Sequence, residues 1–462
     1  MTLIKSISGI RGTIGGAPGD ALTPLDAVAF AGAYGTWLRN RRGAGRLKVV
    51  IGRDARPSGA MVSNLVSSTL LGLGIDVVDL GLSTTPTVEV MVPEFGADGG
   101  IILTASHNPI NWNALKLLNE KGEFVNAEDG AEILRIAEAG EMNFAAVEEL
   151  GTLTTYEHAI ADHINQILAL EDVDVEAITA ANFTVAIDAV NSTGGLSIPP
   201  LLKALGVKNT IELYCEPTGI FPHNPEPLEK HLGDIMAKVK ETKADVGLVV
   251  DPDVDRLALI CEDGSMFGEE YTLVAVADYL LGRRSGAAVS NLSSSRALRD
   301  IAEKHGGSYS ASAVGEVNVV TEMKAVNAVI GGEGNGGIIY PELHYGRDSL
   351  VGIALFLTHL AKTGMKTSEL RASYPDYFMA KEKIELTPDL DVDAILAQAA
   401  ESYSNEDVST IDGVKINFEK SWVHLRKSNT EPIIRVYTEA PSLEEASALA
   451  QRFINELSTF AS

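Results

Sequence analysis

Three aspartates at alternate positions form the sharpest chemical motif of the sequence. Asp251, Asp253 and Asp255 follow the apolar run 245–250, in the segment DPDVDR. Alternate residues of an extended chain share one side, so the three carboxylates can converge on one hard cation. The neighbouring segments supply no cysteine or histidine cluster, and a ligand set made only of oxygen favours Mg²⁺ over softer metals.

Three other interpretations of this segment stay open. With Glu262 at the twelfth position the spacing imitates an EF-hand loop, but Arg256 stands where that loop needs glycine and 257–261 has the pattern of a strand. An aspartate nucleophile of the haloacid dehalogenase type would also follow an apolar strand, but it would need Thr or Val at position 255. The third interpretation is a solvated acidic turn.

Ser106 belongs to a second motif, TASHNP at 104–109, which directly follows the apolar run 100–103. Pro109 fixes its own φ and restricts the residue before it, so the serine is expected on a tight, exposed turn. The hydroxyl of such a serine can be a nucleophile or phosphoryl carrier. Alternatively, the serine is a turn residue whose hydroxyl bonds to the local backbone. Ten residues on, Lys116 is a candidate proton acceptor if the loop folds back.

A Ser-His hydrolase is the less favoured interpretation of the same segment. The G-x-S-x-G elbow is absent, and the adjacent side chains of Ser106 and His107 need not face each other.

A glycine-rich segment, GGEGNGG at 331–337, contains a formal G-x-G-x-x-G. It is a weak dinucleotide fingerprint, because Tyr340 and Pro341 interrupt the helix that should open there. A loop that presents Glu333 and Asn335 to a polyhydroxyl ligand fits better, and a plain turn is the alternative.

Arginines accompany two further turns. The segment RKSNTEP at 426–432, with Arg435 beyond it, groups guanidinium, hydroxyl and turn N–H donors, a combination that suits a phosphate dianion. A capped surface turn is the alternative. Near the N-terminus, SGIRG places Arg11 between glycines, where a backbone can approach a ligand closely or simply turn.

The elements that must position these motifs alternate between short apolar runs and amphipathic stretches. A helix is predicted at 60–73, and strands are predicted at 47–51, 76–80, 100–103, 183–187, 245–250, 287–290 and 328–330. Such alternation indicates parallel-rich α/β sheets, whose ligand sites lie just past the carboxyl ends of strands.

The C-terminal part differs and predicts a small α+β domain. Its last element is an amphipathic helix at 442–457, where Ser442 and Glu445 can form a capping box. Its strands are predicted at 381–386, 413–418, 422–425 and 433–438.

Composition narrows the class of protein. The 462 residues contain 37 Lys+Arg and 63 Asp+Glu, a net charge of −26, which argues against nucleic acid or an anionic membrane surface as partner. Two cysteines cannot build a disulfide framework. No run of about 18 apolar residues and no signal-peptide pattern is visible, so we expect a cytoplasmic protein.

The five motifs, in this order, resemble the α-D-phosphohexomutase family, and most closely its phosphoglucosamine mutase members. The resemblance spans the chain from SGIRG to RKSNTEPIIR. It implies three tandem mixed α/β sheet domains and a smaller C-terminal α+β domain around a central cleft. The corresponding domains are 1–150 with the phosphoserine loop, 151–262 with the metal loop, 263–368 with the sugar-recognition loop and 369–462 with the phosphate-binding turn.

The resemblance also implies roles for the candidate residues. Ser106 would be the phosphoserine, and its phosphate would complete a site for one Mg²⁺ ion held by Asp251, Asp253 and Asp255. The other catalytic candidates are His107, Lys116, Arg11 and Arg256. Glu333 and Asn335 would bind the sugar. The phosphate that is not transferred would be held by Arg426, Ser428, Asn429, Thr430 and Arg435.

The implied reaction moves phosphate between O6 and O1 of a hexose through a hexose 1,6-bisphosphate, which would serve as intermediate and activator. The expected substrate is a hexose or hexosamine phosphate, with glucosamine 6-phosphate converted to glucosamine 1-phosphate. Phosphoglucomutase or phosphomannomutase activity is the alternative, and a metal-dependent sugar-phosphate phosphatase or a non-catalytic sugar-phosphate binding protein is less favoured. The oligomeric state is not readable from the sequence.

The sequence departs from the family pattern at three places. Pro252 and Val254 replace both glycines of the usual D-G-D-G-D-R, so we expect a stiffer loop that still binds metal. Asn335 and Gly337 replace the usual serine and histidine of the sugar loop, where His344 and Arg347 are candidate substitutes. Beyond the active serine, the usual Asn-Gly is Asn-Ala at 113–114.

Overall fold

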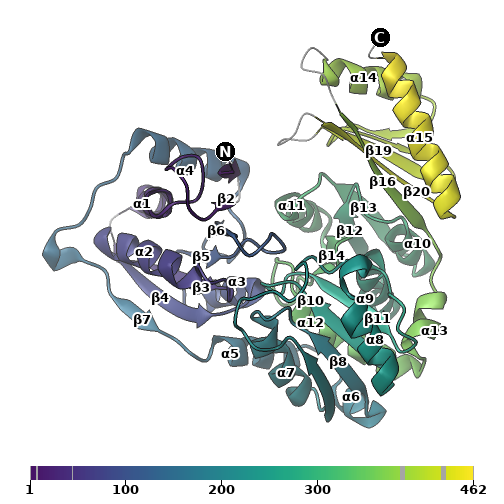
Figure 1. Cartoon of the computed structure of the whole chain (residues 1–462), viewed down its shortest axis with the longest axis horizontal. Helices are drawn as coiled ribbons and strands as arrows, with labels where there is room; N and C mark the ends of the chain where they lie inside the picture. The colour runs from purple at the N-terminus through teal and green to yellow at the C-terminus, as the bar shows by residue number, and fades with distance from the viewer. Residues whose placement is uncertain (1, 7–8, 44, 386–390, 428–432, 461–462) are drawn as a thin grey trace. The chain divides into compact units, whose positions relative to one another are not determined.

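The computed structural model describes residues 2–6, 9–43, 45–385, 391–427 and 433–460 (Figure 1). The chain forms two compact units. Unit 1 comprises Met1–Tyr279 and Asn335–Leu370, and unit 2 comprises Leu280–Gly334 and Arg371–Ser462.

The first sheet of unit 1 is mixed and has the strand order β1-β2-β6-β5-β3-β4-β7. β3, β4, β5 and β7 run parallel, whereas β6 pairs antiparallel with both β5 and β2. The strands are β1 (Ile4–Ser6), β2 (Gly9–Thr13), β3 (Leu47–Arg53), β4 (Ile75–Leu82), β5 (Gly99–Leu103), β6 (Trp112–Leu118) and β7 (Leu153–Thr155).

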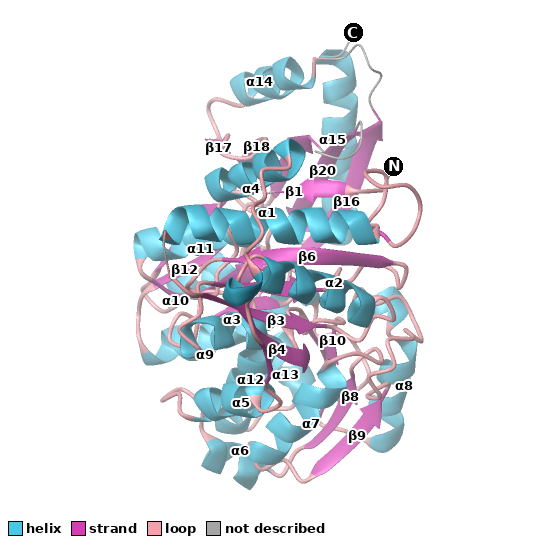
Figure 2. Cartoon of the chain, turned by 90° about the vertical axis from the view of Figure 1, so that its left-hand side faces the viewer, coloured by secondary structure: helices cyan, strands magenta, loops and turns pink. Residues whose placement is uncertain are grey.

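Helices cover both faces of this sheet, because successive side chains of a strand point to opposite faces. Val49 and Ile51 of β3 pack into one hydrophobic core with α1, α2 and α4, and Val50 packs into a second core with α3. Figure 2 looks onto the side that carries α1 and α2. The helices are α1 (Pro24–Arg42), α2 (Gly59–Gly72), α3 (Thr85–Glu94) and α4 (Ala127–Ala139).

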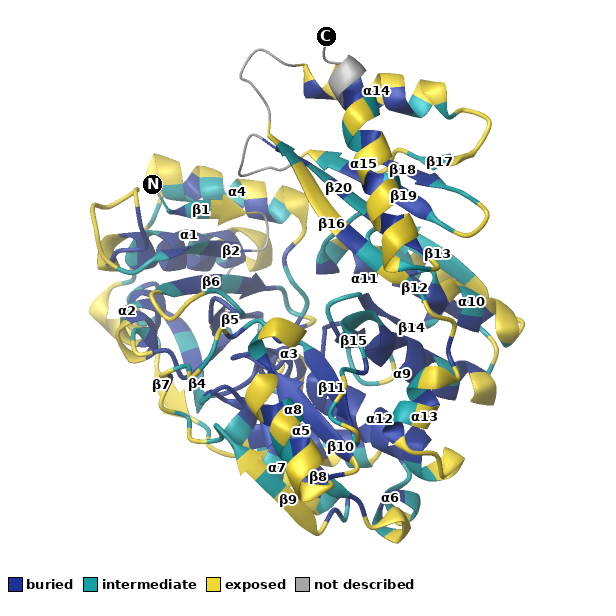
Figure 3. Cartoon of the chain, turned by 45° about the vertical axis from the view of Figure 1, so that its right-hand side comes forward, coloured by how far each residue is buried: buried dark blue, intermediate teal, exposed yellow. Residues whose placement is uncertain are grey.

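The second sheet of unit 1 has the order β11-β10-β8-β9, with β10 parallel to β8 and antiparallel to β11. β10 and β11 are buried along their whole length, as Figure 3 shows. The strands are β8 (Thr184–Asp188), β9 (Asn209–Leu213), β10 (Val246–Val250), β11 (Leu257–Cys261) and a short β15 (Gly337–Ile339) outside this sheet. The helices are α5 (Ala159–Leu168), α6 (Val175–Ala181), α7 (Gly194–Ala204), α8 (Gly233–Thr242) and α12 (Ser349–Thr363). α9 (Glu269–Arg283) and α13 (Thr367–Ala372) lie where the chain passes between the units.

Unit 2 contains a parallel α/β arrangement followed by an antiparallel sheet. β12 lies between β13 and β14 and is parallel to both. The elements are β12 (Ala287–Asn291), α10 (Ala297–Lys304), β13 (Ser308–Ser312), α11 (Glu316–Val326) and β14 (Ala328–Glu333).

The C-terminal sheet has the order β16-β20-β19-β18-β17, and all its pairings are antiparallel. α14 and α15 cover one face and share its hydrophobic core. Exposed and buried positions alternate along α15 in Figure 3, as an amphipathic helix requires. The elements are β16 (Phe378–Glu385), α14 (Val392–Ser402), β17 (Asp407–Ser409), β18 (Val414–Asn417), β19 (Trp422–Lys427), β20 (Ile433–Ala440) and α15 (Leu443–Phe460).

The structure confirms the predicted fold class, with α/β sheets followed by a smaller C-terminal α+β domain. Each strand predicted from an apolar run is present within a few residues of its expected bounds. Half of the predicted capping box is formed, because Ser442 Oγ accepts from the backbone N–H of Glu445 at 3.2 Å. The sequence analysis gave no bounds for several other elements, including β6, α14 and β17. Among the described residues no helix is both long and apolar enough to cross a membrane.

One buried histidine of unit 2 makes the stability of this fold depend on pH. His424 on β19 is 1% exposed. Its Nε2 lies 2.7 Å from the carbonyl oxygen of Asp412, which can only accept, so Nε2 carries the proton and Nδ1 accepts from Ser293 Oγ at 2.9 Å. Burial lowers the pKa of His424 to about 4, although the Asp412 carbonyl opposes that shift.

We therefore predict that acidification destabilises the fold partly through His424. The unfolded chain protonates this histidine near pH 6.5 and the folded chain only near pH 4. The contribution of the neutral His424 imidazole to the free energy of unfolding is therefore complete above pH 6.5 and is lost as the pH falls between those values. The loss should be about 1–3 kcal/mol. Melting temperatures measured between pH 7.5 and 4.5 should fall less steeply for His424→Gln than for the wild type. The exposed-site control His158→Gln should follow the wild type, and an equally steep fall for His424→Gln would refute the prediction.

Candidate active site

The three aspartates lie in the turn between β10 and β11, and all three are fully buried. Their carboxylate oxygens approach within 4.8 Å of one another. β11 begins at Leu257 and pairs antiparallel with β10, which rules out an EF-hand loop here. The burial also rules out a solvated acidic turn.

The backbone of this turn is folded around Asp251. Its Oδ1 accepts from the backbone N–H groups of Asp255 and Arg256 at 3.2 Å each, and its carbonyl accepts from Val254 N at 3.1 Å. Val254 has φ +66° and is buried. A branched residue at positive φ costs about 1–3 kcal/mol, so the surrounding contacts must hold it. This is one of the two positions where the sequence departs from the glycines of the family that it resembles.

Two carboxylate oxygens of the turn are left for a ligand. Within the described part of the chain, Asp253 Oδ1 and Asp255 Oδ1 are buried and have no hydrogen-bond partner. Burial and then repulsion by Asp255 and Asp253 raise the pKa of Asp251 well above its ordinary value. Buried, unpaired carboxylate oxygens are costly without a counter-charge. The residues present therefore fit a bound divalent cation.

Ser106 lies at the edge of this carboxylate group. It follows β5, has φ +48°, and its Oγ donates a hydrogen bond to Asp251 Oδ2 at 2.7 Å. Its backbone N–H donates to Thr104 Oγ1 at 2.9 Å, and that hydroxyl donates to Asp54 Oδ2 at 2.6 Å. The strand ends of two sheets thus bring the serine and the aspartates together.

Arg56, which the sequence analysis did not identify, holds the serine loop in place. Its guanidinium is fully buried and pairs with Asp54 at 2.9 Å. The same group donates to the backbone carbonyl of Ser106, and to those of Asn108 at 2.7 Å, Pro109 at 2.6 Å and Trp112 at 3.2 Å. The signal in the sequence is the charged segment GRDAR at the carboxyl end of β3, a parallel neighbour of β5.

Two cations offset the three carboxylates. Lys116 on β6 places Nζ 2.7 Å from Asp253 Oδ2 and 3.5 Å from Asp255 Oδ2. Burial lowers the pKa of Lys116, but the two carboxylates raise it more strongly, so its pKa lies above the ordinary value. Arg347 Nη2 donates to Asp255 Oδ2 at 2.7 Å. The sequence analysis assigned Arg347 only as a substitute in the sugar loop, whereas the structure places it on the carboxylate turn.

The side chain of His107 approaches that of the adjacent Ser106. Its Nδ1 lies 3.3 Å from Ser106 Oγ. Burial, and after it the charge of Arg256, lowers the pKa of His107 to about 3, so the ring is a poor base. Because the serine hydroxyl is bonded to Asp251, these contacts do not form the Ser-His pair of a hydrolase.

Arg256 and Arg11, the two arginines of unit 1 that the sequence analysis named, have different neighbours. Arg256 Nη1 is 3.5 Å from Glu226 Oε1, a contact that sequence reasoning missed. Arg11 lies on β2 opposite Ala114 of β6, and burial lowers its pKa. Among the residues described, the buried Nε of Arg11 has no hydrogen-bond partner.

The predicted sugar-loop residues are ordered by local contacts. Glu333 ends β14 and accepts from Asn291 Nδ2 at 2.9 Å. Asn335 Oδ1 accepts from the backbone N–H of Gly337 at 3.2 Å. His344, the other candidate substitute, has its Nε2 3.4 Å from Asp348.

The predicted phosphate site places two arginines on neighbouring strands. Arg426 of β19 is directly opposite Arg435 of β20. Like charges in such a pair are unfavourable unless an anion offsets them, and Arg426 also pairs with Asp412 at 2.8 Å. Ser428, Asn429 and Thr430 lie outside the described residues.

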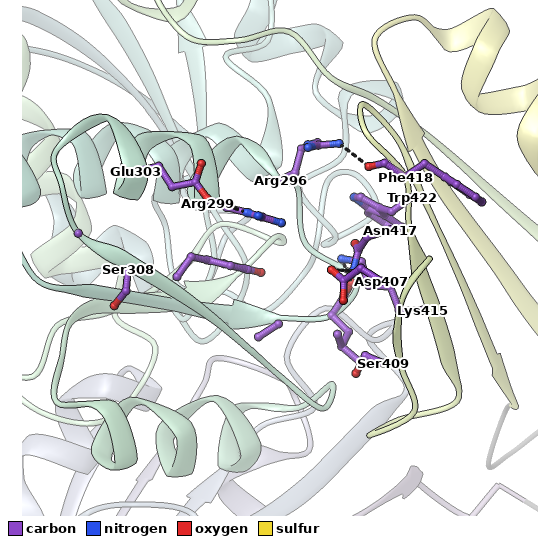
Figure 4. Close-up of a pocket in the computed structure, with 14 residues that line it drawn as sticks. Arg296, Arg299, Glu303, Ser308, Asp407, Ser409, Lys415, Asn417, Phe418 and Trp422 are labelled. Atoms are coloured by element: carbon purple, nitrogen blue, oxygen red, sulfur yellow. Dashed lines mark hydrogen bonds and ion pairs between the residues drawn. The ribbon is translucent and has the colours of Figure 1, made fainter. Parts of the chain in front are cut away.

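Unit 2 also contains a cavity of about 460 Å³ whose lining includes none of the predicted site residues. Figure 4 shows Arg296 and Arg299 facing it from the α10 segment, with Lys415 and Trp422 on the side of the C-terminal sheet. Lys415 donates to the carbonyl of Leu292 at 2.7 Å and lies 4.2 Å from the centre of the Trp422 ring. Lys415 thus connects the segment after β12 to the C-terminal sheet.

Comparison with known proteins decides the family. The four domains of phosphoglucomutase/phosphomannomutase match in order: α/β/α domain I at residues 3–144, domain II at 161–264, domain III at 268–377 and the C-terminal domain at 380–456. The chain belongs to the α-D-phosphohexomutase family. This phosphohexomutase is an intramolecular phosphotransferase, as the resemblance implied.

Relatives match over nearly the whole length of the phosphohexomutase. A phosphoglucomutase/phosphomannomutase of Thermococcus kodakarensis is 38% identical over 94% of this chain and 95% of its own. A phosphoglucosamine/phosphogalactosamine mutase of Sulfurisphaera tokodaii is 33% identical over 97% of both chains. Among solved structures, a phosphoglucomutase/phosphomannomutase family protein of Burkholderia thailandensis has a TM-score of 0.84 and 25% identity over 99% of both chains.

We predict that Arg56→Met loosens the serine loop of this phosphohexomutase. The substitution leaves Asp54 buried without its cation and frees several carbonyls, which should cost about 3–5 kcal/mol of stability. Hydrogen exchange should accelerate across residues 104–112, and kcat should fall by roughly 10²-fold because the serine is misplaced.

Arg53→Met is the matched control, because Arg53 is the neighbouring arginine and is only half-buried. It should leave exchange in the serine loop unchanged. Wild-type exchange and kcat in folded Arg56→Met would contradict the assigned role of Arg56.

Proposed function

We propose that this phosphohexomutase converts glucosamine 6-phosphate to glucosamine 1-phosphate through a phosphorylated Ser106. The observation that carries the mechanism is the 2.7 Å hydrogen bond between Ser106 Oγ and Asp251 Oδ2, within a buried carboxylate turn. The observation that supports the substrate is that relatives matching over the whole chain are named for glucosamine phosphate, from Sulfurisphaera tokodaii at 33% identity and Methanopyrus kandleri at 32%.

In the proposed first half-reaction, the phosphoryl group of phospho-Ser106 passes to the O1 hydroxyl of glucosamine 6-phosphate. The bond from phosphorus to Ser106 Oγ breaks, a bond to O1 forms, and the product is the 1,6-bisphosphate. This intermediate reverses its orientation, and Ser106 takes back the phosphate from O6. A single Mg²⁺ ion held by Asp251, Asp253 and Asp255 would neutralise charge on the transferring oxygens.

Lys116 is the proposed proton donor for this transfer. Its pKa lies above the ordinary value, so at neutral pH it is charged and can protonate Ser106 Oγ as that oxygen leaves. The neutral amine takes up the proton that the O1 hydroxyl releases. In the second half-reaction Lys116 likewise protonates the leaving O6 and accepts the proton of Ser106 Oγ. Arg11, Arg256 and His107 are proposed to stabilise the transferring group, and the buried, unpartnered Nε of Arg11 supports that role.

The binding residues of the substrate are proposed from the motifs. Glu333 and Asn335 would bind sugar hydroxyls. The other phosphate would be held by Arg426, Arg435 and the turn residues Ser428, Asn429 and Thr430. The facing arginines on β19 and β20 support this site, because a phosphate dianion would relieve their mutual repulsion.

We also propose that the enzyme works in the cytoplasm, where its two cysteines, Cys215 and Cys261, would remain free thiols. The domain boundaries near residues 150, 262 and 368 stand as part of the same proposal.

Ser106→Ala should abolish turnover. The alanine cannot carry the phosphoryl group, so kcat should drop by roughly 10³-fold or more. The purified wild type should contain phosphoserine at position 106 by intact-mass and peptide analysis. The exposed-site control Ser265→Ala should retain wild-type kcat, and near-wild-type turnover by Ser106→Ala would overturn the phosphoserine mechanism.

A substrate panel tests the proposed specificity. kcat/KM for glucosamine 6-phosphate should exceed that for glucose 6-phosphate and mannose 6-phosphate by about tenfold or more, since that ratio measures differential transition-state binding. Equal or better turnover of glucose 6-phosphate would reject the glucosamine assignment and favour phosphoglucomutase/phosphomannomutase activity. Steady release of inorganic phosphate would instead indicate a phosphatase.

A further inference from the structure

A second buried group of metal-ligating side chains lies in unit 1, outside the aspartate turn. It consists of His163 on α5, His344 in the loop before α12, and Asp348, which caps α12. Their ligand atoms lie within 4.8 Å of one another. His163 and Asp348 are fully buried, and the His344 side chain is 8% exposed.

The distances in this cluster suit a small four-coordinate cation. His163 Nε2 lies 3.0 Å and His344 Nε2 lies 3.4 Å from Asp348 Oδ2. Ligand atoms around a tetrahedral Zn²⁺, with bonds of about 2.0–2.1 Å, are separated by roughly 3.3 Å. A cation therefore needs only a small adjustment of these side chains.

Two of the three ligands are also oriented by a hydrogen-bond partner behind them. His163 Nδ1 is 3.0 Å from Thr87 Oγ1. His344 Nδ1 lies 3.5 Å from Glu89 Oε2, within ion-pair distance but without a hydrogen bond among the described residues. Asp348 Oδ1 accepts from the backbone N–H of Leu350 at 2.8 Å. Metal-binding histidines usually have their other ring nitrogen held by an oxygen acceptor in this way.

The charge of the cluster also favours a bound cation. Glu89 and Asp348 are 1% and 0% exposed, so two carboxylates are buried beside two imidazoles. A divalent cation bound here would compensate buried carboxylate charge.

We propose that His163, His344 and Asp348 bind one Zn²⁺ ion as a structural site, distinct from the Mg²⁺ site of the aspartate turn. Two imidazoles and one carboxylate form a ligand set that suits zinc, whereas Mg²⁺ prefers oxygen alone. The ion would tie α5 to the start of α12, two segments far apart in the sequence, beside the Thr87 and Glu89 side chains of α3. Water would take the fourth position.

Metal content tests the site directly. The full-length chain is incubated with Zn²⁺ in excess Mg²⁺, desalted and analysed by mass spectrometry for metals. The wild type should retain about one zinc per chain, and His163→Gln and His344→Gln less than about a tenth of that. His359→Gln should retain it, because His359 is also buried and paired with an aspartate, at 3.6 Å from Asp278, but lies outside the cluster.

Two further measurements keep the proposal falsifiable if a variant folds poorly. Asp253→Asn should keep its zinc, because the aspartate turn is a different site. A zinc chelator should lower the melting temperature of the wild type by several degrees and leave that of His163→Gln unchanged. A wild type that retains no zinc, or that melts identically with and without chelator, overturns the proposal, as does full zinc retention by both histidine variants.

Discussion

Mutual repulsion among three buried aspartates is the constraint on which the rest of the active site depends. Asp251, Asp253 and Asp255 are all fully buried, and their carboxylates approach within 4.8 Å. Such a group is stable only if other segments bring compensating charge and hydrogen bonds. β6 supplies Lys116, the loop before α12 supplies Arg347, and the loop after β5 supplies the Ser106 hydroxyl. Asp253 Oδ1 and Asp255 Oδ1, which have no hydrogen-bond partner among the described residues, suit a cation. A cation bound there would offset the repulsion among the aspartates and would also serve the proposed phosphoryl transfer.

Backbone strain is concentrated at the same place. Ser106 and Val254 both have positive φ although neither is glycine, a conformation that persists only when surrounding contacts impose it. At Ser106 those contacts come from Arg56, whose buried guanidinium binds the carbonyls of the serine loop and is itself fixed by Asp54. The fold thus stabilises a serine that points at the carboxylates before any substrate arrives, which is the preorganisation that phosphoryl transfer requires.

The sequence predicted the groups that have a local signature. Strand-end motifs identified Ser106 and the aspartates, and the rule that ligand sites follow strand ends predicted their neighbourhood. Arg56 and Glu226 were missed, and Arg347 was assigned only to the sugar loop, because their importance comes from contacts between segments more than 25 residues apart along the chain, which no local pattern encodes. The cluster of His163, His344 and Asp348 was missed for the same reason. α14 was also missed, although it has a local signal: Asp391 caps it at the backbone N–H of Ala394.

The buried aspartates are proposed to form the cation site on which phosphoryl transfer depends. Calorimetric titration of Mg²⁺ into the phosphorylated chain tests this proposal most directly. The wild type should bind one ion, and Asp253→Asn should bind it at least about tenfold more weakly. The control Asp263→Asn changes an exposed carboxylate in the turn after β11 and should bind Mg²⁺ as the wild type does. Undiminished Mg²⁺ affinity in folded Asp253→Asn would contradict the claim.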